Sequence, residues 1–295
     1  MLSILIPVYK QEISPFVRDL ESAAIKLNIE FEIIIMDDGS GADYSICDSN
    51  LLSHSNIELI KLPENVGRAE IRNKLSEVAE YSNLLYLDAD GQLINNDFIV
   101  NYLPYLNQSK VFSGGRKYSD HEPENKAKFL HWKYGTKYES KPAQIRNESA
   151  YHSFHSNNFL VPKRILLEFP FDKHLITYGY EDSLWANELK KDEIAIQHIE
   201  NPIIHLGVEE AEIFLLKINS SIDNLVKLST TDSKLNLPLE KLYSFIYTVR
   251  CHQLFAYIFS KIKRRIVQNL LGNTPKIWLL QIYKLGLYSE KKASL

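Results

Sequence analysis

The chain has 295 residues, of which 45% are hydrophobic and 24% charged, and its formal net charge is −3. These values are ordinary for a globular protein and exclude a wholly disordered chain. Two cysteines, Cys47 and Cys251, are too few for a disulfide framework and show no metal-ligand spacing. The first residues lack the pattern of a signal peptide, and no apolar run reaches the roughly 18 residues that a membrane-spanning helix needs. We therefore expect a cytoplasmic protein.

The first half of the chain alternates strand and helix patterns. Short apolar runs predict strands at 3–9, 31–36, 57–61 and 84–87, and later at 159–161 and 194–196. Apolar residues of helical period follow Ser14, a good helix cap, and recur from 71 to 79. This alternation predicts an α/β fold with a mostly parallel sheet, flanked by helices and joined by right-handed crossovers.

The second half is less regular. Residues 116–152 are polar with little periodicity, which predicts a long loop with one helix around 126–134. From about Ala211 the pattern becomes helical and includes an aromatic-rich helix at 243–259. We therefore expect a catalytic domain at 1–210 and a helical C-terminal extension at 211–295.

The charges are unevenly distributed along the chain. From Lys261 to the end there are eight Lys or Arg side chains and one acid, Glu290, which gives this segment a net charge of +7 and the first 260 residues −10. A basic segment beside aromatic residues is typical of contact with an anionic membrane. The alternative is a helical subdomain whose aromatic side chains pack on the catalytic domain.

The sharpest chemical signal is Asp88-Ala89-Asp90, directly after the apolar run 84–87. Alternate side chains of an extended segment share a face, so both carboxylates can reach one ligand. Mg²⁺ and Mn²⁺ prefer one or two carboxylates together with substrate phosphate oxygens. We expect Asp90 on the metal and Asp88 on a ribose or a metal-bound water. A solvated turn is the alternative.

Two further polar segments begin near expected strand ends or helix starts. Asp37 and Asp38 directly follow the expected strand 31–36. There they can accept hydrogen bonds from a nucleoside or simply stabilise a turn. Asn65-Val66-Gly67-Arg68 opens a helix, a setting that suits a diphosphate or a base edge, although a capped helix start is an equal alternative.

The late acidic pair Glu181-Asp182 begins another expected helix. A carboxylate there can act as a general base toward an acceptor hydroxyl, or it can simply stabilise the helix dipole. His205, at the end of an apolar run, is a candidate metal ligand or an ordinary strand-end residue.

In this order, the motifs resemble those of family 2 glycosyltransferases of the GT-A fold, a family with many bacterial members. The resemblance covers roughly residues 1–210 and rests on five segments: Ile4-Leu5-Ile6-Pro7-Val8-Tyr9, Met36-Asp37-Asp38-Gly39-Ser40, Asn65-Val66-Gly67-Arg68 with Ile71-Arg72-Asn73, Leu87-Asp88-Ala89-Asp90, and Glu181-Asp182. Ser156-Asn157-Asn158-Phe159 resembles the strand beside the donor sugar, without an individual role.

The resemblance implies metal-dependent transfer of a hexose or N-acetylhexosamine from a nucleoside diphosphate sugar, UDP-linked, to a hydroxyl of a glycan or lipid-linked glycan, with inversion. It implies a single sugar per encounter, since the Gln-x-x-Arg-Trp element of processive members is absent. Asp182 would be the catalytic base, and Asp90 and His205 would bind Mn²⁺ or Mg²⁺. The residues assigned to the nucleotide and donor are Pro7, Val8, Tyr9, Asp38, Asn65, Arg68, Asp88 and Glu181.

By analogy with other members of the family, we expect a role in polysaccharide or cell-envelope synthesis. Peripheral contact with the inner face of the cytoplasmic membrane would fit this role, and we expect no nucleic-acid partner. Two other functions stay open. A sugar-phosphate nucleotidyltransferase normally carries a Gly-rich loop after the first strand, and 7–11 is not one. A non-catalytic nucleotide-sugar-binding or scaffold protein would not need both Asp90 and Asp182.

Overall fold

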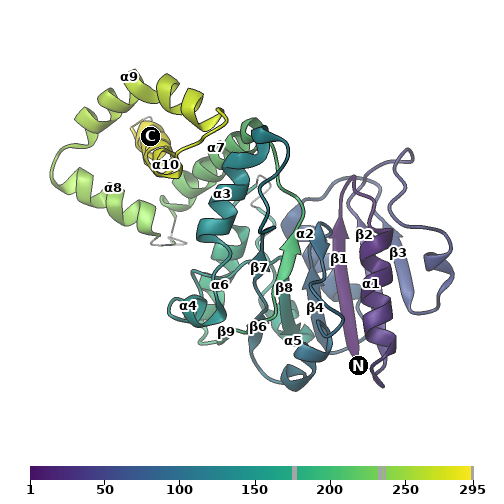
Figure 1. The fold of residues 1–295 in the computed structure, drawn as a ribbon. Coiled ribbons are helices and arrows are strands. Elements are labelled where there is room, and N and C mark those ends of the chain that lie inside the picture. Colours follow the sequence, from purple (N-terminus) through teal and green to yellow (C-terminus); the bar gives the residue numbers. More distant parts are fainter. Residues whose placement is uncertain (175–177, 232–234, 236, 294–295) are drawn as a thin grey trace. The chain divides into compact units, whose positions relative to one another are not determined.

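The computed structural model describes residues 1–174, 178–231, 235 and 237–293. The chain forms two compact units (Figure 1). The sheet unit comprises Met1–Tyr118, Ser140–Ile176 and Glu181–Gly207, and the helical unit comprises Ser119–Glu139, Thr177–Tyr180 and Val208–Leu295. The division into domains at residue 210 stays a prediction.

Among the described residues, the main sheet of the sheet unit has seven strands in the order β3-β2-β1-β4-β8-β6-β9. Their bounds are β1 Leu2–Val8, β2 Phe31–Asp37, β3 Ile57–Lys61, β4 Asn83–Leu87, β6 Val111–Ser113, β8 Asn158–Pro162 and β9 Ile196–His198. The strands β3, β2, β1 and β4 run parallel to one another, whereas β8 runs antiparallel to both β4 and β6. The mostly parallel α/β sheet expected from the sequence is confirmed.

A small second sheet carries three short strands, β5 (Gly91–Gln92), β10 (Ile203–His205) and β7 (Arg116–Lys117). In this sheet β10 is the centre, antiparallel to β5 and parallel to β7. It therefore brings together segments just after β4, just after β6 and near the end of the sheet unit.

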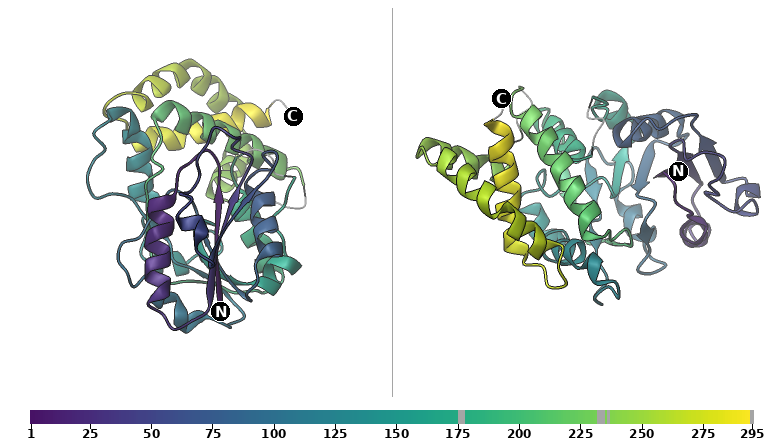
Figure 2. Two further views of the ribbon diagram at one scale, coloured as in Figure 1. Left: turned by 90° about the vertical axis from the view of Figure 1, so that its right-hand side faces the viewer. Right: turned by 90° about the horizontal axis from the view of Figure 1, so that it is seen from above.

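Helices cover both faces of the main sheet (Figure 2). They are α1 (Ser14–Ile25), α2 (Arg68–Val78), α4 (Ala143–Asn147), α5 (Lys163–Glu168) and α6 (Glu181–Lys191), with 3-10 turns at Leu51–Ser53 and Val100–Tyr105. Successive side chains of β1 point to opposite faces of the sheet. Ile4 and Ile6 pack in the core on the face covered by α1, and Leu5 packs in the core on the face covered by α2, α5 and α6. Such a sheet, buried on both faces, reads as continuous apolar runs in the sequence.

The stretch 116–152 is more ordered than the expected loop. It contains β7, a 3-10 turn at Lys126–Lys128, α3 (Phe129–Tyr138) and α4. Part of its anchorage is polar: buried Arg146 donates hydrogen bonds to the carbonyls of Ser113, Gly114 and Ile199. A single buried arginine produces no periodic pattern of apolar residues, so the sequence pattern could not reveal this anchor.

The helical unit contains α3, α7 (Ala211–Leu228), α8 (Pro238–Thr248), α9 (His252–Leu270) and α10 (Ile277–Lys292). The prediction of a single helix at 243–259 is wrong, because the helical structure is interrupted between α8 and α9. Arg250 there takes a left-handed φ of 56°, and the amide of Cys251 bonds to the carbonyl of Ile246. None of the described helices combines the length and apolarity needed to cross a bilayer.

A buried histidine lies beside Arg146. His198 is 3% exposed, and its Nδ1 lies 2.6 Å from a guanidinium nitrogen of Arg146. Since guanidinium only donates, Nδ1 accepts, and Nε2–H donates to the carbonyl of Ala150 at 2.8 Å. Burial, together with the charge of Arg146, lowers the pKa of His198 from 6.5 to about 4 despite the bond to Ala150. The folded protein therefore holds the His198 ring in its neutral form at neutral pH.

We expect His198 to make the fold less stable as the pH falls from 6.5 to about 4. In this window the unfolded chain binds a proton that the folded chain does not, so the contribution is complete above 6.5 and is lost on acidification, by about 3 kcal/mol in all. His198→Gln retains an acceptor for Arg146 without titrating. In urea unfolding at several pH values, it should lose less stability on acidification than wild type. Identical pH dependence in both would contradict this account, and His174→Gln, at an exposed histidine, is the control.

Candidate active site

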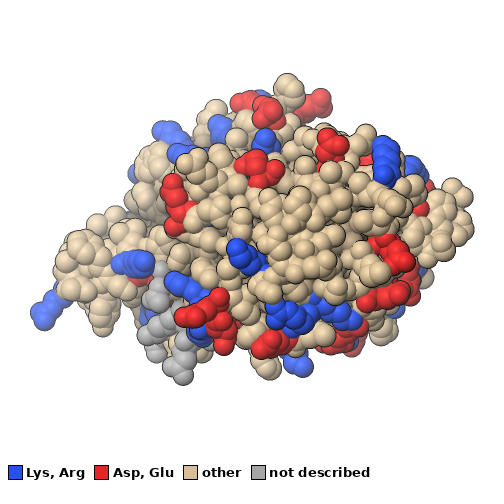
Figure 3. Space-filling model, turned by 90° about the horizontal axis from the view of Figure 1, so that it is seen from below, with Lys and Arg blue, Asp and Glu red and all other residues tan. Residues whose placement is uncertain are grey.

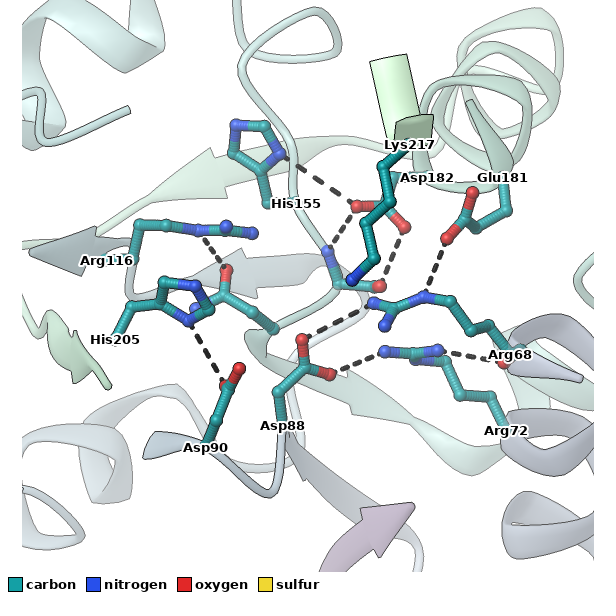
Figure 4. A network of polar contacts seen from close by, with 12 residues as sticks. Arg68, Arg72, Asp88, Asp90, Arg116, His155, Glu181, Asp182, His205 and Lys217 are labelled. Atoms are coloured by element: carbon teal, nitrogen blue, oxygen red, sulfur yellow. Dashed lines mark hydrogen bonds and ion pairs between the residues drawn. The ribbon is translucent and has the colours of Figure 1, made fainter. Parts of the chain in front are cut away.

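Polar residues from distant parts of the sheet unit converge because β8 runs antiparallel to β4. Leu87, the last residue of β4, pairs with Asn158, the first of β8. The residues that precede β8 therefore lie beside those that follow β4, and the amide of Asp88 donates to the carbonyl of Asn157 at 3.0 Å. Figure 4 shows the resulting network.

Asp88 is bound by two arginines of α2. Its carboxylate accepts from Arg72 at 2.6 Å and, at 3.5 Å, from Arg68. Arg72 is 2% exposed and also donates to the carbonyl of Arg68 at 2.8 Å. The first turn of α2 and the segment after β4 are thus joined through charge-assisted hydrogen bonds, which are stronger than neutral ones.

Asp90 lies against His205. The distance from Asp90 Oδ1 to His205 Nδ1 is 3.2 Å, and the Asp90 carbonyl accepts from the amide of Leu206 at 2.9 Å. The pairing of β5 with β10 sets His205 opposite Gly91 and so explains this proximity. Burial alone would raise the pKa of Asp90, but the hydrogen bond and charge of His205, with the charges of nearby arginines, hold the pKa below its ordinary value of 3.8.

Asp182, the second residue of α6, is held by Ser156. Its two carboxylate oxygens accept from the amide of Ser156 at 3.0 Å and from the hydroxyl at 2.7 Å, and Nδ1 of His155 lies 3.9 Å away. Burial opposes ionisation, yet the charges of Arg72, His155 and Arg68, with the Ser156 bond, lower the pKa of Asp182 below 3.8. Asp182 is therefore ionised at neutral pH with its orientation fixed.

The preceding residue, Glu181, has a different partner. Its carboxylate accepts from Nε of Arg68 at 2.8 Å, and 8% of its side chain is exposed. Arg68 thus links the start of α6 to Asp88. The predicted residues Arg68, Asp88 and Glu181 are therefore contiguous in the structure, as are Asp90 and His205.

Asp38 lies after β2 and caps the turn that precedes α2. Its carboxylate accepts from the amides of Val66 at 2.7 Å and Gly67 at 3.1 Å. Burial raises the pKa of Asp38 above 3.8, although these two amide bonds act in the opposite direction. Asp37 accepts from the amide and hydroxyl of Ser40, so the stabilised-turn interpretation describes Asp37.

Four other predicted residues lie at the carboxyl end of β1 and before α2. Val8 is buried, and its carbonyl accepts from the amide of Asp38 at 2.8 Å. Pro7 is half-buried, whereas Tyr9 and Asn65 are exposed. Pro7, Val8 and Tyr9 thus adjoin Asp38 through the β1–β2 pairing.

The donor set at Asp90 and His205 fits a divalent cation that takes its other ligands from substrate and water. Among the described residues, no group of three or more His, Cys, Asp or Glu side chains could hold a metal ion by itself. Mg²⁺ is commonly bound by one or two carboxylates together with substrate phosphates. Gly207 supports the fit, because a Cβ at this position would lie 2.0 Å from Oδ2 of Asp90. The glycine leaves room for the carboxylate.

Sequence reasoning assigned no individual role to several residues of this network. Arg116 donates to the side chain of Asn157 at 3.3 Å, and β7 places it beside β10. His155 and Ser156 contact Asp182. The resemblance around 156–159 was the available signal for Ser156. Arg116 lies at the start of the stretch 116–152, which the sequence predicts to be a long loop with one helix around 126–134, and nothing there singles it out.

The chain belongs to glycosyl transferase family 2, whose sequence model matches residues 3–166. It is a glycosyltransferase that uses a nucleotide sugar, and the family resemblance noted in the sequence is thereby confirmed. No curated protein matches the sequence significantly.

Two solved structures align with nearly the whole chain. The mannosyltransferase PcManGT from Pyrobaculum calidifontis, in complex with GDP-Man and Mn²⁺, aligns over 99% of this chain and 86% of its own with a TM-score of 0.58 and 12% identity. S. aureus TarS 1–349, in complex with UDP-GlcNAc, aligns over 99% and 90% with a TM-score of 0.49 and 14% identity. The first likeness, with the family match, defines a GT-A fold.

We expect Arg72→Met to destabilise the sheet unit by about 3 kcal/mol, because it leaves the largely buried Asp88 carboxylate without its closest cation. Methionine retains helix propensity and most of the side-chain volume. Lys74→Met, on the same helix but at a more solvent-accessible i,i+4 pair with Glu70, is the matched control and should change stability by no more than about 0.5 kcal/mol. Urea unfolding measures both, and equal effects would show that the buried pair has no special weight.

Proposed function

We propose that the protein transfers a single hexose or N-acetylhexosamine from a nucleoside diphosphate sugar to a hydroxyl of a glycan or lipid-linked glycan, with inversion and with dependence on a divalent metal. The observation that supports this most directly is the carboxylate of Asp182. It is ionised, held by Ser156 and joined through 155–157 to the segment that carries Asp88.

Asp182 is the proposed general base. A carboxylate of low pKa is a weak base toward a free hydroxyl, but the acceptor oxygen becomes strongly acidic as it bonds to the anomeric carbon. Asp182 then takes the proton, while the two bonds from Ser156 hold the carboxylate in place. Attack from the face opposite the leaving diphosphate inverts the anomeric configuration. Fixing the base and both substrates in line accounts for much of the rate.

The nucleotide and diphosphate are assigned to the edge formed by β1, β2 and α2. Pro7, Val8 and Tyr9 adjoin Asp38, which fixes the turn leading to Asn65 and the start of α2. In this proposal Arg68 supplies positive charge, with Asp88 and Glu181 setting its direction. Backbone amides at the start of α2 add the favourable potential of a helix N-terminus for an anion.

Asp90 and His205 are the residues proposed to hold Mn²⁺ or Mg²⁺. When bound, the cation neutralises charge on the diphosphate leaving group. The solved mannosyltransferase binds GDP-Man with Mn²⁺, so a donor screen should include GDP-linked sugars as well as the UDP-linked sugars we expect.

Asp182→Asn should reduce kcat by about 10²–10⁴-fold while leaving donor affinity nearly unchanged, because the amide cannot accept the proton but still occupies the same space. A transfer assay gives kcat, and calorimetry with the donor and Mn²⁺ gives affinity. Glu188→Gln makes the same carboxylate-to-amide change at an exposed position of α6 and should behave as wild type. Undiminished turnover in Asp182→Asn would remove this residue from the mechanism.

Asp90→Asn and His205→Ala should each weaken Mn²⁺-dependent donor binding by about tenfold or more, because each removes one of two protein ligands. Donor titrations with Mn²⁺, and again with a chelator, separate the metal-dependent part. Asp97→Asn is the control at an exposed aspartate nearby in the chain. If both site variants gain as much affinity from Mn²⁺ as the control does, the metal does not bind here.

A further inference from the structure

Exposed apolar side chains are concentrated in one part of the helical unit. Among the described residues, 23 large hydrophobic side chains are exposed, and ten of these lie between Leu242 and Trp278, in α8, α9, the start of α10 and the turns that join them. They are Leu242, Phe245, Tyr247, Val249, Leu254, Tyr257, Ile258, Ile262, Leu271 and Trp278. Single exposed apolar residues are normal, but a cluster of this size indicates an interaction surface.

On α8 the apolar side chains form a stripe that faces away from the helical unit. Leu242 and Phe245 of α8 and Val249, the residue that caps it, follow the i, i+3, i+7 spacing of one helix face and are 48%, 65% and 48% exposed. The opposite side of the helix packs within the unit, since the ring of Tyr243 lies 5.1 Å from that of Tyr288 in an edge-to-face arrangement. An amphipathic helix with its apolar stripe outward needs a partner.

The inner face of α9 packs on α10. Phe259, Ile266 and Leu270 are buried, and Gly286 of α10 allows close contact because a Cβ there would lie 2.3 Å from the Phe259 ring. Phe259 is therefore a core residue, which agrees with the packing alternative for this one aromatic side chain.

The outer face of α9 has an apolar half and a basic half. Leu254, Tyr257 and Ile258 are exposed in the first half. At positions seven, ten and eleven residues after Leu254 the same face carries Lys261, Arg264 and Arg265, all exposed. One helix face thus combines apolar insertion with positive charge.

The segment has no compensating acids. No Asp or Glu occurs between Glu240 and Glu290, whereas eight Lys or Arg side chains do. Lys263 pairs with Glu290 at 2.7 Å, but within the described part of the chain Arg264 and Arg265 form no ion pair. At the left end of Figure 3, which corresponds to α8 and α9 in Figure 1, the surface is mostly tan with blue atoms.

We propose that the outer faces of α8 and α9 dock on an anionic phospholipid bilayer, lying in the plane of its interface. Amphipathic helices with Lys and Arg beside aromatic and aliphatic residues bind such interfaces, and the membrane's negative potential attracts basic segments. A second copy of this chain is a poorer occupant, because a symmetric contact would set the basic face of α9 against itself. This inference goes beyond the transfer reaction and does not depend on the identity of the donor.

The test is flotation of the full chain with vesicles of equal parts phosphatidylglycerol and phosphatidylcholine, compared with phosphatidylcholine alone. We expect binding to the anionic vesicles, weakened by added salt, and little binding to the neutral ones. Arg264→Gln with Arg265→Gln should weaken binding about 30-fold, from about 1 kcal/mol per basic residue. Phe245→Ser should weaken it at least about tenfold.

Matched controls lie on the sheet unit. Lys26→Gln with Lys110→Gln removes two exposed charges, and Ile25→Ser removes an exposed apolar side chain of α1. Thermal melting checks that every variant is folded. Absence of flotation by wild type, equal binding to both vesicle types, or equal losses in site and control variants would overturn the proposal.

Size-exclusion chromatography with light scattering tests the competing occupant. A wild-type dimer that becomes a monomer in Phe245→Ser would assign the surface to self-association and would also overturn the proposal. None of these measurements uses a sugar donor, so their failure leaves the proposed transferase function standing, and failure of transfer leaves the membrane surface standing.

Discussion

Where β8 pairs with β4 in the antiparallel sense, the chain before β8 runs alongside the chain after β4, and the rest of the polar site depends on this. Within 155–157 the backbone and side chains contact Asp88, Asp182 and Arg116. A parallel neighbour at this position would have brought its carboxyl end there instead. One reversal of strand direction thus joins an early acidic turn to a helix almost a hundred residues later.

The side chains of the candidate site hold one another in place through ion pairs and hydrogen bonds. Asp88 is neutralised by α2, Glu181 contacts Arg68, Asp90 contacts His205, and Asp182 is fixed by a serine. Polar groups held in this way need little rearrangement during a reaction. Such preorganisation is the main source of electrostatic catalysis in enzymes. The lowered pKa values of Asp90 and Asp182 follow from the same network, because each carboxylate lies near positive or hydrogen-bonding partners.

Most of the sheet unit could be predicted from its sequence, because buried strands such as 84–87 are continuous apolar runs and α1 has a regular helical period. The order of motifs identified the family. Exact partners could not be predicted: the pairing of Arg72 with Asp88 depends on how two elements meet in space, and Arg116 reaches the site through a strand of only two residues. The break at Arg250 also escaped notice, since the sequence there has neither glycine nor proline.

The close approach of Gly207 to Asp90 has a consequence for related sequences. A Cβ at this position would lie 2.0 Å from Oδ2 of Asp90, so any larger residue here requires the Asp90 carboxylate to turn away from its present position. An alanine two residues after the strand-end histidine would therefore signal a rearranged aspartate even where both acidic residues of the Asp-x-Asp segment persist. The second residue after β10 is thus a marker, readable from sequence alone, of whether a relative can keep its aspartate beside this histidine.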